Sequence, residues 1–183
     1  MAEKKLSYPV IAAVRADEEL ENALNSKVKI IFDLNPDLMT VEEKVKKAHG
    51  ARKRFFIHID LANGIGKDKS GILFAKKAGV DGIISTRVNI VKLAKEAGMF
   101  TVQRFFIVDS HSITTTAEAV KAAKPDMIEI MPGIVTKVVR ALKDQMDVPI
   151  ISGGLIETEQ ELEQMLESGA AAVSTGKKEL WDR

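Results

Sequence analysis

The sequence predicts a compact (β/α)8 TIM barrel that forms a single domain over residues 1–183, and three observations carry this prediction. Eight short apolar runs, rich in β-branched and aromatic residues, alternate with amphipathic stretches. A small residue followed by glycine joins a helical stretch to the next run at Gly79, Gly98 and Gly169. Eight units of about 23 residues fit the length, although such barrels usually reach about 250 residues. A doubly wound open sheet is the alternative, and it normally has fewer strands.

The eight apolar runs are the expected strands. In chain order they cover residues 9–14, 29–34, 55–61, 82–85, 100–105, 127–131, 149–152 and 171–174. Gly, Pro, Asp or Asn bounds each run, as is typical of parallel strands whose outer face is covered by helices.

Helix-start motifs lie between the runs. Thr and Glu stand three residues apart at 40–43 and at 158–161, which is the spacing of a capping box. Asp17 is an expected N-cap for the first helix. Apolar residues at helical spacing over 134–142 indicate a further helix.

The composition is that of a globular protein and excludes several classes. Lys and Arg number 27 against 26 Asp and Glu, so the net charge is +1, which excludes a protein that coats nucleic acid through its overall field. The chain has no Cys, which excludes disulfides, thiol nucleophiles and cysteine metal sites. The apolar run near the start is too short and too soon followed by charges for a signal peptide or membrane span. We therefore expect a cytoplasmic protein with no membrane partner.

Strand parity predicts a polar layer at the C-terminal ends of the strands. Alternate residues of a barrel strand point into the lumen, and the inferred phase places Ser85, Gln103, Ser152 and Ser174 inward. The same reasoning gathers charged and imidazole groups at this end, at Arg15, Asp33, His58, Asp60, Arg87 and Glu129. Ligand sites of barrels lie there. Since a buried unpaired carboxylate is costly, the acids should pair with Arg15, Arg87 or His58, or with a polyhydroxy ligand. A purely structural ion-pair layer is the alternative.

Two glycine turns predict a phosphate site after the last two strands. The candidate residues are Ser152, Gly153, Gly154, Ser174, Thr175, Gly176 and Lys177. Barrels often bind phosphate in the loops after strands seven and eight, where Gly lets backbone N–H groups approach an anion. The alternative is a pair of ordinary turns.

Two further features bear on partners. A basic cluster offers weak candidates for contacts with nucleic-acid phosphates, namely Lys44, Lys47, Arg52, Lys53 and Arg54. Such clusters are more often a solvated helix face, and one Tyr and one Trp make an RNA-stacking platform hard to build. No metal or cofactor is predicted, although acidic residues in the lumen leave magnesium open.

Several segments together resemble the glycerol-3-phosphate-responsive antiterminator family. They lie in order along nearly the whole chain, at residues 9–15, 56–61, 82–87, 103–106, 129–133, 149–156, 174–176 and 180–181. The resemblance implies a bacterial regulator of glycerol uptake and use, which binds glycerol 3-phosphate and then contacts leader mRNA so that transcription passes a terminator. It implies that the two glycine turns hold the phosphate. It also implies that Asp33, His58, Asp60 and Glu129 meet the glycerol hydroxyls, while Arg15 and Arg87 balance the acids or reach the phosphate.

Two other functions stay open at this point. One is an enzyme acting on a small phosphorylated polyol or sugar, a lyase, isomerase or transferase, with His58, Asp60 and Glu129 as acid and base. The other is a small-molecule binding protein without an RNA role. A homodimer is also open, because barrels often pair.

Overall fold

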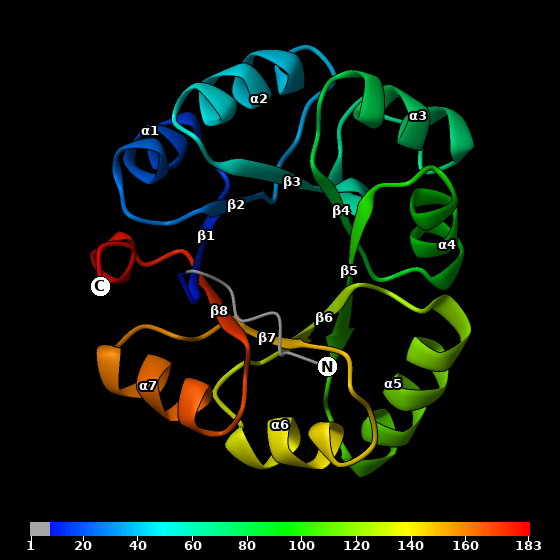
Figure 1. The fold of residues 1–183 in the computed structure, drawn as a ribbon, viewed down its shortest axis with the longest axis vertical. Coiled ribbons are helices and arrows are strands. Elements are labelled where there is room, and N and C mark those ends of the chain that lie inside the picture. Colours follow the sequence, from blue (N-terminus) through cyan, green and yellow to red (C-terminus); the bar gives the residue numbers. More distant parts are fainter. Residues whose placement is uncertain (1–7) are drawn as a thin grey trace.

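Eight parallel strands close into a barrel in sequence order in the computed structural model, which describes residues 8–183 (Figure 1). The strands are β1 (Val10–Val14), β2 (Ile30–Asp33), β3 (Arg54–His58), β4 (Gly82–Ser85), β5 (Phe100–Phe106), β6 (Met127–Met131), β7 (Ile150–Gly153) and β8 (Ala172–Thr175). Closure is direct, because Val10 of β1 pairs with Val173 of β8. The predicted (β/α)8 barrel is confirmed.

Within residues 8–183, one α-helix follows each of the first seven strands and covers the outside of the barrel (Figure 1). The helices are α1 (Asp17–Asn25), α2 (Val41–Gly50), α3 (Lys69–Lys77), α4 (Val88–Glu96), α5 (Ser110–Ala123), α6 (Thr136–Lys143) and α7 (Glu159–Glu167). The expected capping box forms at Thr158. At Thr40 the backbone is already helical and the side chain makes no capping bond, so that expected box is wrong.

The eighth unit is shortened. In the described residues, β8 leads into the 3-10 turn η2 (Lys178–Leu180) rather than an α-helix. Trp181 is buried behind this turn, where its indole Nε1 donates to the Thr175 carbonyl at 2.9 Å. The end of the chain lies between α1 and α7 (Figure 1). One aromatic side chain thus lies where the other units have a helix, which shortens the eighth unit.

Alternation along the strands produces two separate cores. One set of strand side chains, including Ile31, Ile57 and Ile130, packs with the helices. The other set fills the lumen, where Phe56 packs on Phe32 and Phe100 with ring centroids 5.6 and 5.5 Å apart. This apolar packing closes the N-terminal half of the lumen, so that a ligand site is left only at the C-terminal mouth.

Every helix within residues 8–183 is too short or too polar to span a bilayer.

Candidate functional site

A cavity of about 330 Å³ opens at the C-terminal mouth of the barrel. Its walls are Ala13, Arg15, Leu34, Arg104, Glu129, Met131, Gly154, Leu155, Ile156, Glu157, Ser174, Thr175, Gly176 and Lys177. The ends of β1, β5, β6, β7 and β8 position most of these residues. A second hollow lies between α1 and the end of the chain, away from the strand ends that carry the predicted site.

The cavity contains a buried ion pair. Arg104 Nε donates to Glu129 Oε2 at 2.6 Å, and Ser174 Oγ donates to Glu129 Oε1 at 2.5 Å. Glu129 is fully buried, and Arg104 is 6% exposed. A Cβ on Gly153 would lie 2.5 Å from Glu129 Oε1, so glycine is needed there to make room for the carboxylate. Within residues 8–183 no hydrogen bond occupies the terminal guanidinium nitrogens of Arg104, which leaves them to bind a ligand.

The two glycine turns meet at the same cavity, beside the buried ion pair. Gly154 and Leu155 are both left-handed, with φ of +76° and +60°. Thr175 Oγ1 donates to the Ile156 carbonyl at 2.7 Å and accepts from Lys177 N at 3.1 Å. The loops after β7 and β8 are therefore tied directly to each other, as the predicted phosphate site requires.

The charges that line the cavity favour an anion. Arg15, Arg104 and Lys177 supply three cations, and Glu129 and Glu157 supply two carboxylates, which leaves one net positive charge. The Lys177 Nζ to Glu157 Oε1 distance is 3.7 Å in an exposed setting, where an ion pair contributes little and is easily exchanged for another partner.

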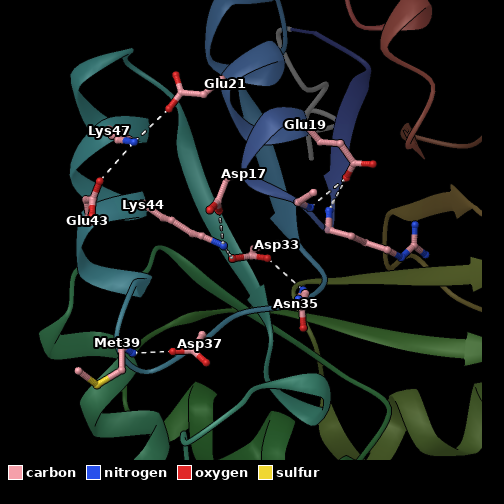
Figure 2. Close-up of polar contacts among 12 residues, drawn as sticks. Asp17, Glu19, Glu21, Asp33, Asn35, Asp37, Met39, Glu43, Lys44 and Lys47 are labelled. Atoms are coloured by element: carbon pink, nitrogen blue, oxygen red, sulfur yellow. Dashed lines mark hydrogen bonds and ion pairs between the residues drawn. The ribbon is translucent and has the colours of Figure 1, made fainter.

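Asp33 lies outside this cavity, so its expected inward orientation is wrong. Its side chain lies on the helix side of β2, with Ile31, because Phe32 occupies the lumen. Figure 2 shows Asp33 held by Lys44 Nζ at 3.3 Å and by the backbone N–H of Asn35. Burial raises the pKa of the Asp33 carboxyl, and Lys44 opposes that rise.

The predicted inward phase is also wrong for Ser152, Gln103 and Ser85. In β7, Ile151 and Gly153 face the lumen, so Ser152 between them faces the helices. In β5, Val102 faces the lumen, so the next residue, Gln103, faces outward. In β4, Ile84 faces the lumen, so Ser85 faces outward. The Ser152 hydroxyl and the Gln103 amide are buried without a hydrogen-bond partner in the described part of the chain.

Asp60 and Arg87 form a separate cluster beside β4. Asp60 lies in the 3-10 turn η1 (Ile59–Leu61), past the end of β3, where its carboxylate accepts from Ser85 Oγ and Thr86 N at 2.8 and 2.7 Å. Burial pushes the pKa of Asp60 upward, but these hydrogen bonds outweigh it and the pKa is lowered. Arg87 Nε is 3.7 Å from this carboxylate. Neither side chain lines the cavity.

His58 lies below the cavity and does not line it. It follows Phe56 on the lumen side of β3 and is 3% exposed. Burial, and then the charge of Arg104, lower the pKa of His58 to about 4. The imidazole is therefore neutral at pH 7.

The predicted basic cluster divides into two parts. On α2, Lys44 contacts Asp17 and Asp33, while Lys47 contacts Glu21 and Glu43 (Figure 2). This face is charge-balanced and offers little attraction to phosphates. Lys53, by contrast, is buried, and Arg52 and Arg54 are exposed at the opposite end of the barrel from the cavity.

Arg104 is the member of the buried ion pair that the sequence does not predict. Its position follows from the alternation of Phe100 and Val102, which face the lumen two residues apart. The adjacent Gln103 obscured this phase, because a polar residue in a strand was expected to face the polar layer.

The comparisons with known proteins agree over nearly the whole chain. The family model "Glycerol-3-phosphate responsive antiterminator" matches residues 10–181. The uncharacterized protein YgcP of Escherichia coli K12 is 37% identical over 174 residues, which cover 94% of this chain and 91% of that protein.

Solved structures give the same result. The glycerol uptake operon antiterminator regulatory protein of Listeria monocytogenes is 32% identical, with a TM-score of 0.92 and coverage of 99% of this chain and 98% of that one. A glycerol uptake operon antiterminator-related protein of Thermotoga maritima is 30% identical, with a TM-score of 0.86 and coverage of 96% and 99%. Aldolase barrels at 17% and 13% identity share the fold alone. The chain therefore belongs to the glycerol-3-phosphate-responsive antiterminator family.

Proposed function

We propose that this protein binds glycerol 3-phosphate in the cavity at the C-terminal mouth and, depending on that ligand, contacts leader mRNA so that transcription passes a terminator. Family membership supports a regulator of this kind. The observation that carries the ligand is the cavity itself, which has a loop-lined cationic end and a buried Arg104–Glu129 pair. A volume of about 330 Å³ is at the small end for ligand pockets.

The phosphate would lie at the end formed by Gly154, Thr175, Gly176 and Lys177. Loop backbone there can approach an anion closely, and Arg15 lies on the same wall. A charge-assisted hydrogen bond to phosphate is stronger than a neutral one. Arg15 and Lys177 are therefore expected to contribute most of the affinity for the anion.

The glycerol hydroxyls would lie toward Glu129, Arg104 and Ser174. A carboxylate accepts hydrogen bonds from hydroxyl groups, and the free guanidinium nitrogens donate to them. Because these groups already hold one another in place, the site is preorganised and a small polyol loses little in binding. Asp33, Asp60, Arg87 and Ser152 have no part in this arrangement, since they lie outside the cavity.

A regulator is favoured over an enzyme by the arrangement of the acidic and basic groups. Of the three residues that an acid–base mechanism would use, His58 and Asp60 do not line the cavity. Glu129 alone of the three lines it, where Arg104 and Ser174 hold its carboxylate in place. Regulation further requires that the ligand bind one conformational state more tightly than another.

Calorimetric titration with glycerol 3-phosphate tests the ligand. We expect binding that Arg15→Gln weakens by about tenfold to a hundredfold, because one charge-assisted hydrogen bond contributes about 1.5–3 kcal/mol. Arg87→Gln is the matched control, since it removes the same charge outside the cavity and should leave affinity unchanged. No heat and no thermal shift at millimolar ligand would exclude the sensor. For the RNA half, affinity for the leader transcript should depend on the ligand and fall with salt.

A further inference from the structure

Arg52 occupies a position that other helix ends of this barrel give to glycine. Its N–H donates to His49 O, and the next N–H, of Lys53, donates to Ala48 O. The same pair of bonds closes α3, α4 and α7, where the left-handed residue is Gly79, Gly98 or Gly169. Arg52 nevertheless has φ of +57°, which disfavours a side chain. The fold thus keeps a cation where glycine would be more stable.

Three more exposed cations lie beside Arg52. Arg54 begins β3, and its N–H donates to the carbonyl of Lys29 at 2.9 Å, just before β2. Lys27 lies two residues earlier in the same loop. We call Lys27, Lys29, Arg52 and Arg54 the basic edge. Within residues 8–183 none of the four forms an ion pair.

A buried lysine holds the two loops of the basic edge together. Lys53 Nζ donates to the carbonyls of Ser26 and Val28 at 2.6 and 2.7 Å, on either side of Lys27. Burial lowers the pKa of Lys53, and the charge of Lys29 lowers it further. The loops are therefore fixed by interior contacts, which leaves the four exposed cations to face solvent.

The acids near the basic edge are already engaged. The Asp182 carboxylate accepts the backbone N–H of Lys27, and Asp81 accepts that of Phe55 and contacts His49. These bonds satisfy the carboxylates without neutralising any of the four side chains by direct contact. On α2, by contrast, Lys44 and Lys47 each meet two acids.

The basic edge also lacks the apolar component of a membrane-binding surface. The large exposed apolar side chains of the described residues lie at strand ends, in the loops and the 3-10 turn that follow strands, or on α3. They are Leu38, Met39, Leu61, Leu73, Phe106, Val108, Ile134 and Leu155. The basic edge lies on loops that precede strands, at the other end of the barrel. Interfacial binding to lipid needs apolar side chains beside the cations, whereas phosphate-backbone binding needs only the cations.

From these observations we infer that the basic edge binds the phosphate backbone of RNA. The inference rests on the proposed function, and it places the RNA at the opposite end of the barrel from the ligand cavity. Arg52 and Arg54 remain RNA-contact residues, as the sequence predicts. Lys27 and Lys29 join them, and Lys44 and Lys47 do not. Lys53 positions the loops and does not itself contact RNA.

Fluorescence anisotropy with a labelled RNA stem–loop, with and without millimolar glycerol 3-phosphate and between about 50 and 200 mM salt, tests the inference. Replacing all four residues of the basic edge with Gln should weaken binding at least tenfold and reduce the slope of log affinity against log salt by about three. Lys47→Gln, on the charge-balanced face of α2, should change affinity less than twofold.

Arg52→Gly separates a role in RNA binding from a role in folding. We expect the melting temperature to rise by about 2–4 °C, because glycine suits the left-handed position, while RNA affinity falls by about threefold or more. Lys124→Gly is the matched control. Lys124 is also left-handed, with φ of +51°, and ends α5 on the far side of the barrel from β2 and β3. It should raise the melting temperature and leave RNA affinity unchanged.

Three results would overturn the inference. They are an equal loss of RNA affinity in Lys124→Gly, unchanged RNA binding in the four-residue variant, and wild-type protein that binds vesicles of anionic phospholipid but not the RNA. The ligand proposal is judged separately, by titrating glycerol 3-phosphate into the four-residue variant. Its affinity for that ligand should equal that of the wild type whatever happens to RNA binding.

Discussion

The two halves of the barrel lumen are built from the same strands but from opposite chemistry. The N-terminal half is filled by Phe32, Phe56 and Phe100, whose rings stack or tilt against one another. The C-terminal half holds a buried ion pair and an open cavity. In the first half, apolar area alone excludes water. In the second, a few polar groups must hold one another in place and still leave space for a ligand.

The difference teaches that stability and binding are separable along the barrel axis. Apolar packing is non-directional and scales with buried area, so changes in the N-terminal half should act on stability. Buried polar groups depend on specific partners. Changes in the C-terminal half should therefore alter ligand affinity, and some of them should also alter stability. Four substitutions test this division.

Phe56→Ala should have the largest effect on stability. It removes the ring that contacts both other aromatic side chains, and such changes cost about 3–5 kcal/mol. Gly82 lies against this ring, so on that side no side chain can move in to fill the cavity. Urea unfolding measures the loss. The division fails if the variant folds with wild-type stability, or if it is well folded and yet no longer binds glycerol 3-phosphate.

Lowering the pH should destabilise the protein through His58, at the boundary of the two halves. The pKa of His58 is lowered to about 4 in the folded protein, against about 6.5 when unfolded. The unfolded state therefore takes up the proton first as pH falls, and stability is lost from about pH 6.5 down to about 4. At 1.36 kcal/mol per pKa unit the loss approaches about 3 kcal/mol.

His58→Leu is the reference for this measurement. Asp33 titrates alike in both proteins, so the difference between the two unfolding curves reports His58 together with its coupling to Asp60. Unfolding free energies measured by denaturant at several pH values should diverge below about pH 6.5. Parallel curves would show that the imidazole is freely protonated in the folded state.

Gly153→Ala should have an intermediate effect on both properties. The added Cβ would lie 2.5 Å from Glu129 Oε1 and 2.7 Å from Ser174 Oγ. Overpacking of this kind costs about 1–3 kcal/mol, and the displaced carboxylate should also weaken ligand binding. Thermal unfolding and calorimetry measure the two effects. A variant that loses neither stability nor affinity would mean that the buried pair shifts freely.

The fold could be predicted from the sequence because its determinants are local and repeated. Apolar runs alternate with helical stretches eight times, and Gly79, Gly98 and Gly169 end three helices as expected. The replacement of the last helix by Trp181 could not be predicted, since it depends on the space between α1 and α7. The same holds for Arg52, whose left-handed backbone follows from a helix end and is not evident from its side chain.

The site could be predicted only in part, because strand phase decides which polar residues meet. Glu129 and Ser174 lie in the cavity together, and the two glycine turns adjoin them. The sequence predicts the wrong face for Asp33 and Ser152, because a polar residue near a strand end need not face the lumen. In β2 the phase is set by Phe32, and in β7 by the small residue Gly153, which must lie beneath the Glu129 carboxylate.

Gly176→Ala should have the smallest effect on stability and is the sharpest test of the cavity. A Cβ there would meet nothing closer than the Ala13 carbonyl at 3.5 Å, which is ordinary contact. Packing therefore does not demand glycine, unlike at Gly153, and we expect a stability change within about 0.5 kcal/mol. The proposed phosphate needs the loop backbone to approach closely, so the methyl group should weaken glycerol 3-phosphate binding by about tenfold. If calorimetry shows unchanged affinity, the phosphate does not lie against the loop after β8. A large loss of stability would mean that neighbouring protein atoms occupy the space beside Gly176.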